Sequence, residues 1–302
     1  MSTPDIHQKR IDHINLLTLG DRRNPPLVLI HGIRDVSWSL IPVAAVFSDN
    51  YFVVIPDLRG HGDSEKPGNY AIHQFIFDLE NLLRQLNLGP VNLFGHSLGG
   101  HIVIRTAALY PELVQRLIVV EGLGPPERPG EASQQSDFRH YADRLHRSMR
   151  LHRRLRPLPS AEFAAERILA NNPRISPEFA RWLVEHSTEW VEGELHWKFD
   201  ARVEQLWLSN ENPDSREYYR QVQCPTLVVN ADLAHEYWTR QISIPGWSGR
   251  YSDAELKRKV SSFPNAELVH MKHAGHMTHY DAPMDLAREM QSFFDSSNLG
   301  SL

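Results

Sequence analysis

One serine of this 302-residue chain lies in a pattern that is typical of a nucleophile. Gly95-His96-Ser97-Leu98-Gly99 matches G-x-S-x-G and lies between an apolar run that predicts a strand and a segment that predicts a helix. The small residues at the two ends of this pattern allow a sharp backbone turn, which would lift the Ser97 hydroxyl clear of a sheet. The free N–H groups at the start of the following helix favour negative charge there. Ser97 is therefore the candidate nucleophile of an acyl-transfer reaction.

Acyl transfer also requires two N–H donors that face the oxyanion developing on the substrate carbonyl. His31-Gly32-Ile33 ends another apolar run, and the loop after that strand is the expected source of one donor. The residue after the nucleophile supplies the other. We therefore expect the backbone amides of Ile33 and Leu98 to form an oxyanion hole.

These groups must be positioned by elements whose pattern is clear in the first half of the chain. Strands are predicted at 14–19, 27–30, 51–55, 91–94 and 117–120, and helices at 69–88 and 98–109. Apolar, β-branched runs separated by helices are typical of a parallel sheet that is covered on both faces. The strand pattern resumes at 225–229 and 267–270, a capping box at Ser252-x-x-Glu255 predicts another helix, and a last helix fits 283–294.

A different pattern separates these two parts. A Pro/Gly-rich segment at 122–131 is followed, from about 133 to 209, by a stretch in which we expect helices and no strand of the earlier type. We therefore predict an α/β core of residues 1–122 and 223–302, with a helical cap inserted at 123–222. A basic stretch from Arg139 to Arg156 is either a solvated face or an attraction for acidic substrates or a partner. The insertion also carries aromatic residues that could face a substrate or pack between cap and core: Trp182, Trp190, Trp197, Phe199 and Trp207.

Composition excludes several classes of protein. With 32 Lys+Arg against 37 Asp+Glu, the formal charge is −5, and the 41% of hydrophobic residues is typical of a globular domain. The apolar runs are far shorter than the roughly 20 residues that cross a bilayer, and a mildly acidic chain gives no reason to expect nucleic acid. The first ten residues lack the apolar stretch of a signal peptide, and the single cysteine, Cys224, has no internal disulfide partner. We therefore expect a cytoplasmic protein without a membrane partner.

Taken together, several motifs make the chain resemble the α/β-hydrolase superfamily. The matching segments, in the family's order, are LVLIHG (27–32), PDLRGHGDS (56–64), LFGHSLGG (93–100), PTLVV (225–229) and HAGH (273–276). The resemblance implies the α/β-hydrolase fold: a mostly parallel eight-stranded sheet with helices on both faces and a helical cap inserted after the sixth strand. In PDLRGHGDS we expect Asp57, Arg59 and His61 to tie the loop together and not to take part in chemistry.

The chain has 17 histidines, and four of them follow one another at intervals of three residues: His270, His273, His276 and His279. The family motif has its base at the last His of HAGH, so the resemblance implies that His276 takes the Ser97 proton. Spaced histidines are also common metal ligands, but Gly275 and the strand pattern before it speak against a helix that would align all four. We expect no metal and no organic cofactor.

The carboxylate that would orient His276 is less clear. Many family members carry it three residues beyond a Gly after the seventh strand, but in PTLVVNADLA Ala231 and Ala234 stand at those two positions. Asp232 and Glu236 lie close to the usual position but are displaced. Glu121 directly follows the 117–120 run, and some haloalkane dehalogenases, which share the fold, have Glu there. We prefer Glu121 over Asp232 and Glu236 as the acid.

The sequence thus predicts a serine hydrolase, in the first place a carboxylesterase that cleaves small to medium acyl esters. It leaves the oligomeric state open, with a homodimer as one option. A carbon–carbon bond hydrolase and a cofactor-free perhydrolase would use the same triad. Haloalkane dehalogenases and epoxide hydrolases have an Asp nucleophile where this chain has Ser97. The alternative of another class is a non-catalytic receptor or interaction protein on the same fold.

Overall fold

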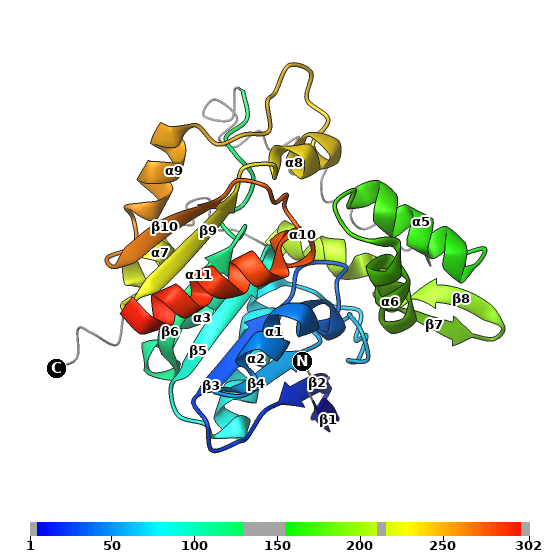
Figure 1. Cartoon of the computed structure of the whole chain (residues 1–302), viewed down its shortest axis with the longest axis horizontal. Helices are drawn as coiled ribbons and strands as arrows, with labels where there is room; N and C mark the ends of the chain where they lie inside the picture. The colour runs from blue at the N-terminus through cyan, green and yellow to red at the C-terminus, as the bar shows by residue number, and fades with distance from the viewer. Residues whose placement is uncertain (1–4, 130–154, 210–215, 297–302) are drawn as a thin grey trace.

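An eight-stranded sheet forms the centre of the molecule, whose computed structural model describes residues 5–129, 155–209 and 216–296 (Figure 1). The strand order is β1-β2-β4-β3-β5-β6-β9-β10. The strands are β1 (His7–Ile11), β2 (Ile14–Leu19), β3 (Pro26–Ile30), β4 (Phe52–Pro56), β5 (Val91–His96), β6 (Val114–Val120), β9 (Thr226–Ala231) and β10 (Ala266–Met271). β2 pairs antiparallel with β1 and β4, and the other neighbours are parallel. The predicted fold class is therefore confirmed, and the polar strand β1 is an addition that the apolar pattern did not indicate.

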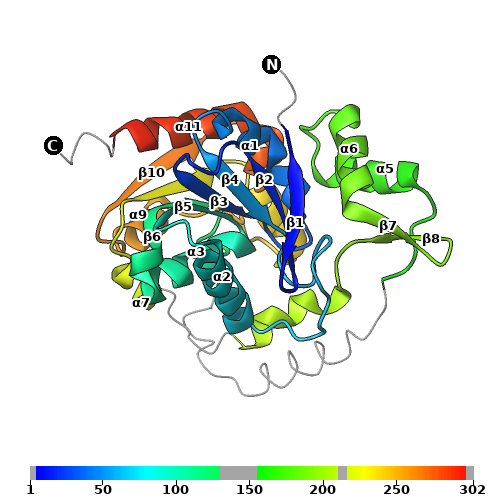
Figure 2. The same ribbon diagram turned by 90° about the horizontal axis from the view of Figure 1, so that it is seen from below.

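Helices cover both faces of this sheet. α1 and α11 pack on one face, and α2, α3, α7 and α9 pack on the other (Figure 2). The helices of the core are α1 (Ile41–Phe47), α2 (Ile72–Leu86), α3 (Leu98–Leu109), α7 (Arg216–Gln221), α8 (His235–Gln241), α9 (Asp253–Val260), α10 (Thr278–Asp281) and α11 (Pro283–Ser296), with short 3-10 turns η1 (Ser37–Leu40) and η2 (Pro111–Leu113). As the capping box predicts, α9 begins after Ser252, whose hydroxyl accepts a hydrogen bond from the Glu255 amide.

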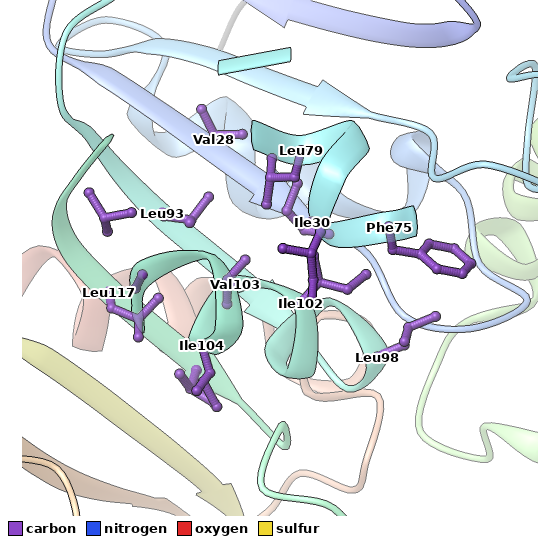
Figure 3. Close-up of a cluster of buried hydrophobic side chains, with 14 of the residues drawn as sticks. Val28, Ile30, Phe75, Leu79, Leu93, Leu98, Ile102, Val103, Ile104 and Leu117 are labelled. Carbon is purple, nitrogen blue, oxygen red and sulfur yellow. The ribbon is translucent and has the colours of Figure 1, made fainter. Parts of the chain in front are cut away.

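The central strands are buried on both faces because their side chains alternate between two hydrophobic clusters. In β3, Val28 and Ile30 face the cluster with α2 and α3, whereas Leu27 and Leu29 face the cluster with α1 and α11. Figure 3 shows Val28 and Ile30 beside Leu79 and other apolar side chains of the first cluster. Truncating such a fully buried aliphatic side chain to alanine costs about 2–5 kcal/mol. These clusters fix the strand ends that carry the site.

The segment between β6 and β9 has a small hydrophobic cluster of its own. Its elements are α5 (Ala161–Asn171), α6 (Pro177–Ser187), β7 (Thr188–Val191), β8 (Glu194–Trp197) and η4 (Ala201–Ser209). Ser160 and Ser176 cap α5 and α6, because their side chains accept hydrogen bonds from the amides of Phe163 and Phe179. In Figure 1, α5, α6 and the β7–β8 hairpin lie to one side of the sheet. Most of the basic stretch Arg139–Arg156 lies outside the described residues, as does the Trp207 side chain.

One part of this segment differs from the expectation of helices alone. β7 and β8 form an antiparallel hairpin whose turn residues Glu192 and Gly193 have φ values of 50° and 83°. Two successive positive φ values are what a two-residue hairpin turn of type I′ needs, and glycine is favoured there. The prediction of helices throughout 133–209 is therefore wrong at Thr188–Trp197, since Glu-Gly is a weaker turn signal than Asn-Gly.

The end of the inserted segment returns to the core. Val203 and Leu206 of η4 and Tyr219 of α7 belong to the buried cluster that includes α2 and α3, and the Tyr219 ring stacks on Phe263. An inserted cap that extends to residue 222 therefore includes residues that pack with the core. In the described ranges, no helix combines the length and the apolar composition that a membrane crossing requires.

Candidate active site

Ser97 lies in the turn between β5 and α3, at the carboxyl ends of the parallel strands. Its φ is 52° and its ψ is −114°, which is outside the conformations that L-residues usually adopt. Its amide donates to the carbonyl of Val120 at 3.0 Å, which ties the turn to β6. A Cβ on Gly95 would overlap the Gly99 carbonyl, and one on Gly99 would overlap the Ile30 carbonyl, so both positions require glycine. This is the geometry predicted from G-x-S-x-G.

His276 follows β10 and reaches Ser97 from across the strand ends. Its Nε2 lies 3.0 Å from Ser97 Oγ, and its Nδ1 lies 3.1 Å from Glu121 Oε2. His276 is 3% exposed and Glu121 is 7% exposed, so the contact between them is shielded from water. With Nδ1–H donating to Glu121, Nε2 is free to accept the proton of the Ser97 hydroxyl. The structure brings these three residues together.

Glu121 is held by the ends of two neighbouring strands. Its amide donates to the Val229 carbonyl at 3.0 Å, and its Oε1 accepts from the Ala231 amide at 2.6 Å. The other oxygen, Oε2, faces His276. Its φ of 51° lies in the left-handed region that non-glycine residues rarely adopt, and such strain is commonly found at functional sites.

The two other carboxylates that the sequence offered as the acid face different partners. Asp232 Oδ1 lies 3.2 Å from Nδ1 of the exposed His270. Both oxygens of Glu236 accept hydrogen bonds from Arg174, at 2.7 and 2.6 Å. Neither carboxylate therefore has the contact with His276 that Glu121 makes.

The expected oxyanion amides lie on the two loops that meet at Ser97. A Cβ on Gly32 would come within 3.3 Å of the Ser97 Cβ, so the loop that carries Ile33 runs against Ser97. Leu98 begins α3. Within the described residues, neither the Ile33 amide nor the Leu98 amide has a hydrogen-bond acceptor. Two such N–H groups can receive an oxyanion.

The loop PDLRGHGDS is tied together by its polar residues, as expected. Asp57 accepts hydrogen bonds from the Ser37 amide at 2.7 Å and from the Asn15 side chain at 2.9 Å. Arg59 forms a buried ion pair with Asp78. His61 is fully buried, and burial lowers its pKa to about 3, so its imidazole stays neutral. These contacts tie the loop to β2, η1 and α2.

Two aromatic residues of α8 contact the His276 ring, and the sequence patterns did not single them out. The Tyr237 ring stacks on the imidazole, with centroids 4.0 Å apart and an interplanar angle of 12°. Trp238 approaches it edge-on, at 5.0 Å and 67°. Both residues lie just after the segment in which the triad acid is usually found, and this position is the one indication of a role that the sequence offers. No spacing rule predicts a stack with a residue some forty positions away.

Among the described residues, Asp35, His96 and His279 offer metal-ligand atoms within 4.8 Å of one another. The Asp35 carboxylate is already used as an acceptor: Ser39 Oγ donates at 2.9 Å, Tyr280 at 2.8 Å, and His279 Nε2 lies at 3.1 Å. These contacts link the loop after β3 with η1 and α10. Of the four spaced histidines, His276 faces Ser97 and His279 faces Asp35, so the row does not converge on one point.

Comparisons with known proteins agree with this fold. The family description "alpha/beta hydrolase fold" matches residues 25–154. An (E)-2-((N-methylformamido)methylene)succinate hydrolase of Acinetobacter baylyi is 37% identical over 274 residues, which cover 90% of this chain and 91% of that protein. The thioesterase domain from the curacin biosynthetic pathway has the same fold, with a TM-score of 0.79 at 23% identity over 96% of this chain and 99% of that one.

Other relatives match over a shorter stretch. An uncharacterised protein of Mycobacterium tuberculosis is 40% identical over 101 residues, which are 33% of this chain and 30% of that protein. The chain thus spans less than a third of that relative's length. The Acinetobacter match, in contrast, extends over nine tenths of both chains. The chain belongs to the alpha/beta hydrolase fold family.

Proposed function

We propose that the protein is a serine hydrolase that cleaves carboxylic esters through an acyl-enzyme on Ser97. Ser97 Oγ attacks the ester carbonyl carbon while its proton passes to His276 Nε2. The charge on the carbonyl oxygen is received by the amides of Ile33 and Leu98. Glu121 keeps the His276 tautomer and stabilises the imidazolium.

Three further proton transfers complete the cycle. The imidazolium returns its proton to the leaving alcohol oxygen as the bond between carbonyl carbon and alcohol oxygen breaks, which leaves the acyl group on Ser97. A water then attacks the acyl carbon and gives a proton to His276. The imidazolium passes this proton to Ser97 Oγ as the bond between the acyl carbon and Oγ breaks, which releases the carboxylic acid and the free Ser97 hydroxyl. This sequence requires no redox step and no further reactant.

The observation that carries the proposal is the chain of contacts through His276. One imidazole nitrogen lies 3.0 Å from Ser97 Oγ and the other lies 3.1 Å from Glu121 Oε2. A buried carboxylate on one nitrogen and a hydroxyl on the other is the arrangement that turns a serine into a nucleophile.

Hydrolysis of p-nitrophenyl acetate and butyrate by the purified protein tests the proposal. We expect Ser97→Ala to abolish turnover and to prevent covalent labelling by a fluorophosphonate probe. Turnover that survives in Ser97→Ala would disprove the serine mechanism. A wild-type chain that neither hydrolyses esters nor takes the label would instead favour a non-catalytic binding protein.

A second substrate class is favoured by one comparison. The Acinetobacter relative, which matches over 90% of this chain, is named for hydrolysis of a formamide that carries a succinate group. The same triad can cleave an amide, since His276 would then protonate a leaving nitrogen. Matched ester and amide substrates, with and without a carboxylate on the leaving part, decide between the two classes.

We further propose that α5, α6 and the β7–β8 hairpin form the cap over this site and that the protein is cytoplasmic. The separate hydrophobic cluster of these elements supports the cap. Cys224 supports the second point, because it is the sole cysteine of the chain and so has no partner for the internal disulfide that is common outside reducing compartments.

A further inference from the structure

The His276 imidazole is fixed in three ways, of which the serine mechanism uses two. Its two nitrogens face Ser97 and Glu121 in the plane of the ring. One face of the ring is covered by Tyr237, at a centroid distance of 4.0 Å and an angle of 12°, while Trp238 adds an edge contact at 5.0 Å. A nearly parallel stack prevents the imidazole from tilting out of the plane in which both nitrogens reach their partners.

The stack also has an electrostatic consequence. The face of an aromatic ring carries the negative end of its quadrupole, so it attracts a cation placed over it. The imidazole becomes a cation at one stage of the proposed reaction, when Ser97 loses its proton. A contact that is stronger with imidazolium than with neutral imidazole acts mainly on the transition state.

We propose that Tyr237 is a positioning residue for the base: its ring holds His276 between Ser97 and Glu121 and favours the imidazolium. The inference rests on the proposed function, since it takes His276 as the base. Tyr237 is itself well anchored, because its neighbour Glu236 accepts two hydrogen bonds from Arg174. Burial raises the pKa of the Tyr237 phenol, so the ring stays neutral over the working range.

Other ionisable groups also face these rings. Glu121 and His96 lie against His276, the latter with ring centroids 5.2 Å apart. Burial holds the pKa of His96 well below its ordinary value, so the His96 imidazole is neutral. Arg34 and Arg240 carry the charges that act on the Tyr237 phenol. All of these groups stay in place when only the Tyr237 ring is changed.

Two ring replacements of nearly equal shape test the electrostatic part. Phenylalanine at position 237 keeps the negative ring face, whereas pentafluorophenylalanine at the same position reverses it. The pKa of His276 is measured by NMR titration in a Ser97→Ala background, and the acid limb of the kcat/KM profile is measured with Ser97 present. We expect Tyr237→Phe to resemble the wild type and the fluorinated ring to lower the His276 pKa by about half to one unit.

The positioning part is tested by removing the ring. Tyr237→Leu is expected to lower kcat about tenfold with little change in KM, because the imidazole loses its alignment in the transition state. Tyr219→Leu is the matched control, since Tyr219 also stacks in the interior, on Phe263 at 4.6 Å, but on α7. It is expected to lower stability and to leave the pH profile unchanged.

The outcomes separate cleanly. The inference is overturned if the Phe and pentafluorophenylalanine variants at position 237 have the same His276 pKa or the same kcat/KM pH profile. A Tyr237→Leu chain with wild-type kcat would overturn it as well. Failure of the serine mechanism is recognised independently by activity that survives in Ser97→Ala, because the NMR titration needs no substrate.

Discussion

Glu121 illustrates how one residue acquires its place from the strands around it. It follows the last residue of β6 in a left-handed conformation, and its carboxylate is divided between the Ala231 amide and His276. The amide fixes one oxygen, so the other is presented to His276 Nδ1 with little freedom. A carboxylate held in this way can set the tautomer of the base.

The first prediction concerns this carboxylate. Glu121→Gln should lower kcat by about 10³–10⁴-fold, because a neutral amide stabilises the imidazolium poorly and can favour the wrong tautomer. Steady-state ester hydrolysis measures the effect. Asp232→Asn is the control, since Asp232 faces the exposed His270 and should keep near wild-type kcat. A large loss in Asp232→Asn together with a small one in Glu121→Gln would reverse the assignment of the acid.

At the scale of elements, a contact from the inserted segment holds both sides of the His276 loop. Arg174, between α5 and α6, binds Glu236 of α8 and lies 3.4 Å from Asp281 of α10. Asp281 in turn accepts a hydrogen bond from the Gly275 amide at 2.7 Å. α8 carries the ring that covers His276, and Gly275 directly precedes it. The arrangement links the inserted segment to His276 from two directions.

The second prediction concerns that link. Arg174→Gln should destabilise the chain by about 1–3 kcal/mol, because it leaves the buried Asp281 carboxylate without its cation. We also expect kcat to fall several-fold, measured with the same ester substrate, since α8 and the loop before His276 lose a common anchor. Arg181→Gln is the matched control, because its pair with Glu178 on α6 is exposed on both sides and contributes little. Equal effects of the two variants would contradict the link.

At the scale of the whole molecule, the many histidines make folding sensitive to acid. Burial lowers the pKa of His61 and of His101 to about 3, and holds that of His96 well below its ordinary value. In the unfolded chain the same groups have a pKa near 6.5. Between these values the unfolded state binds more protons than the folded one. The stability contributed by keeping these imidazoles neutral is therefore complete above about pH 6.5 and is lost as the pH falls.

The third prediction follows from this sign. The free energy of unfolding, measured by denaturant titration between pH 7.5 and 4.5, should fall below about pH 6.5 by ~1.4 kcal/mol per pH unit for each such histidine. His61→Gln should reduce this slope by the contribution of one histidine. His273→Gln is the control, since His273 is exposed and should leave the slope unchanged. A flat profile down to pH 5 would contradict the burial of neutral imidazoles.

The sequence by itself determined the features that local pattern controls. The strands from 14 to 120 and the α3 helix follow from short apolar runs and turn residues, and Ser97 follows from the glycines that its turn requires. These features depend on neighbours within a few positions, so their physical causes are all present in the segment itself. The hairpin at Thr188–Trp197 escaped prediction because its turn pair is a weak local signal.

Only the tertiary structure decided which groups meet at His276. Glu121 and His276 are 155 positions apart, and the sequence left Glu121, Asp232 and Glu236 as alternatives. The choice depends on β6 and β9 being neighbours in the sheet, where the Ala231 amide turns the Glu121 carboxylate toward His276. The Tyr237 stack is likewise a contact between separate elements. Such contacts arise from packing the whole sheet and its helices, and no local spacing encodes them.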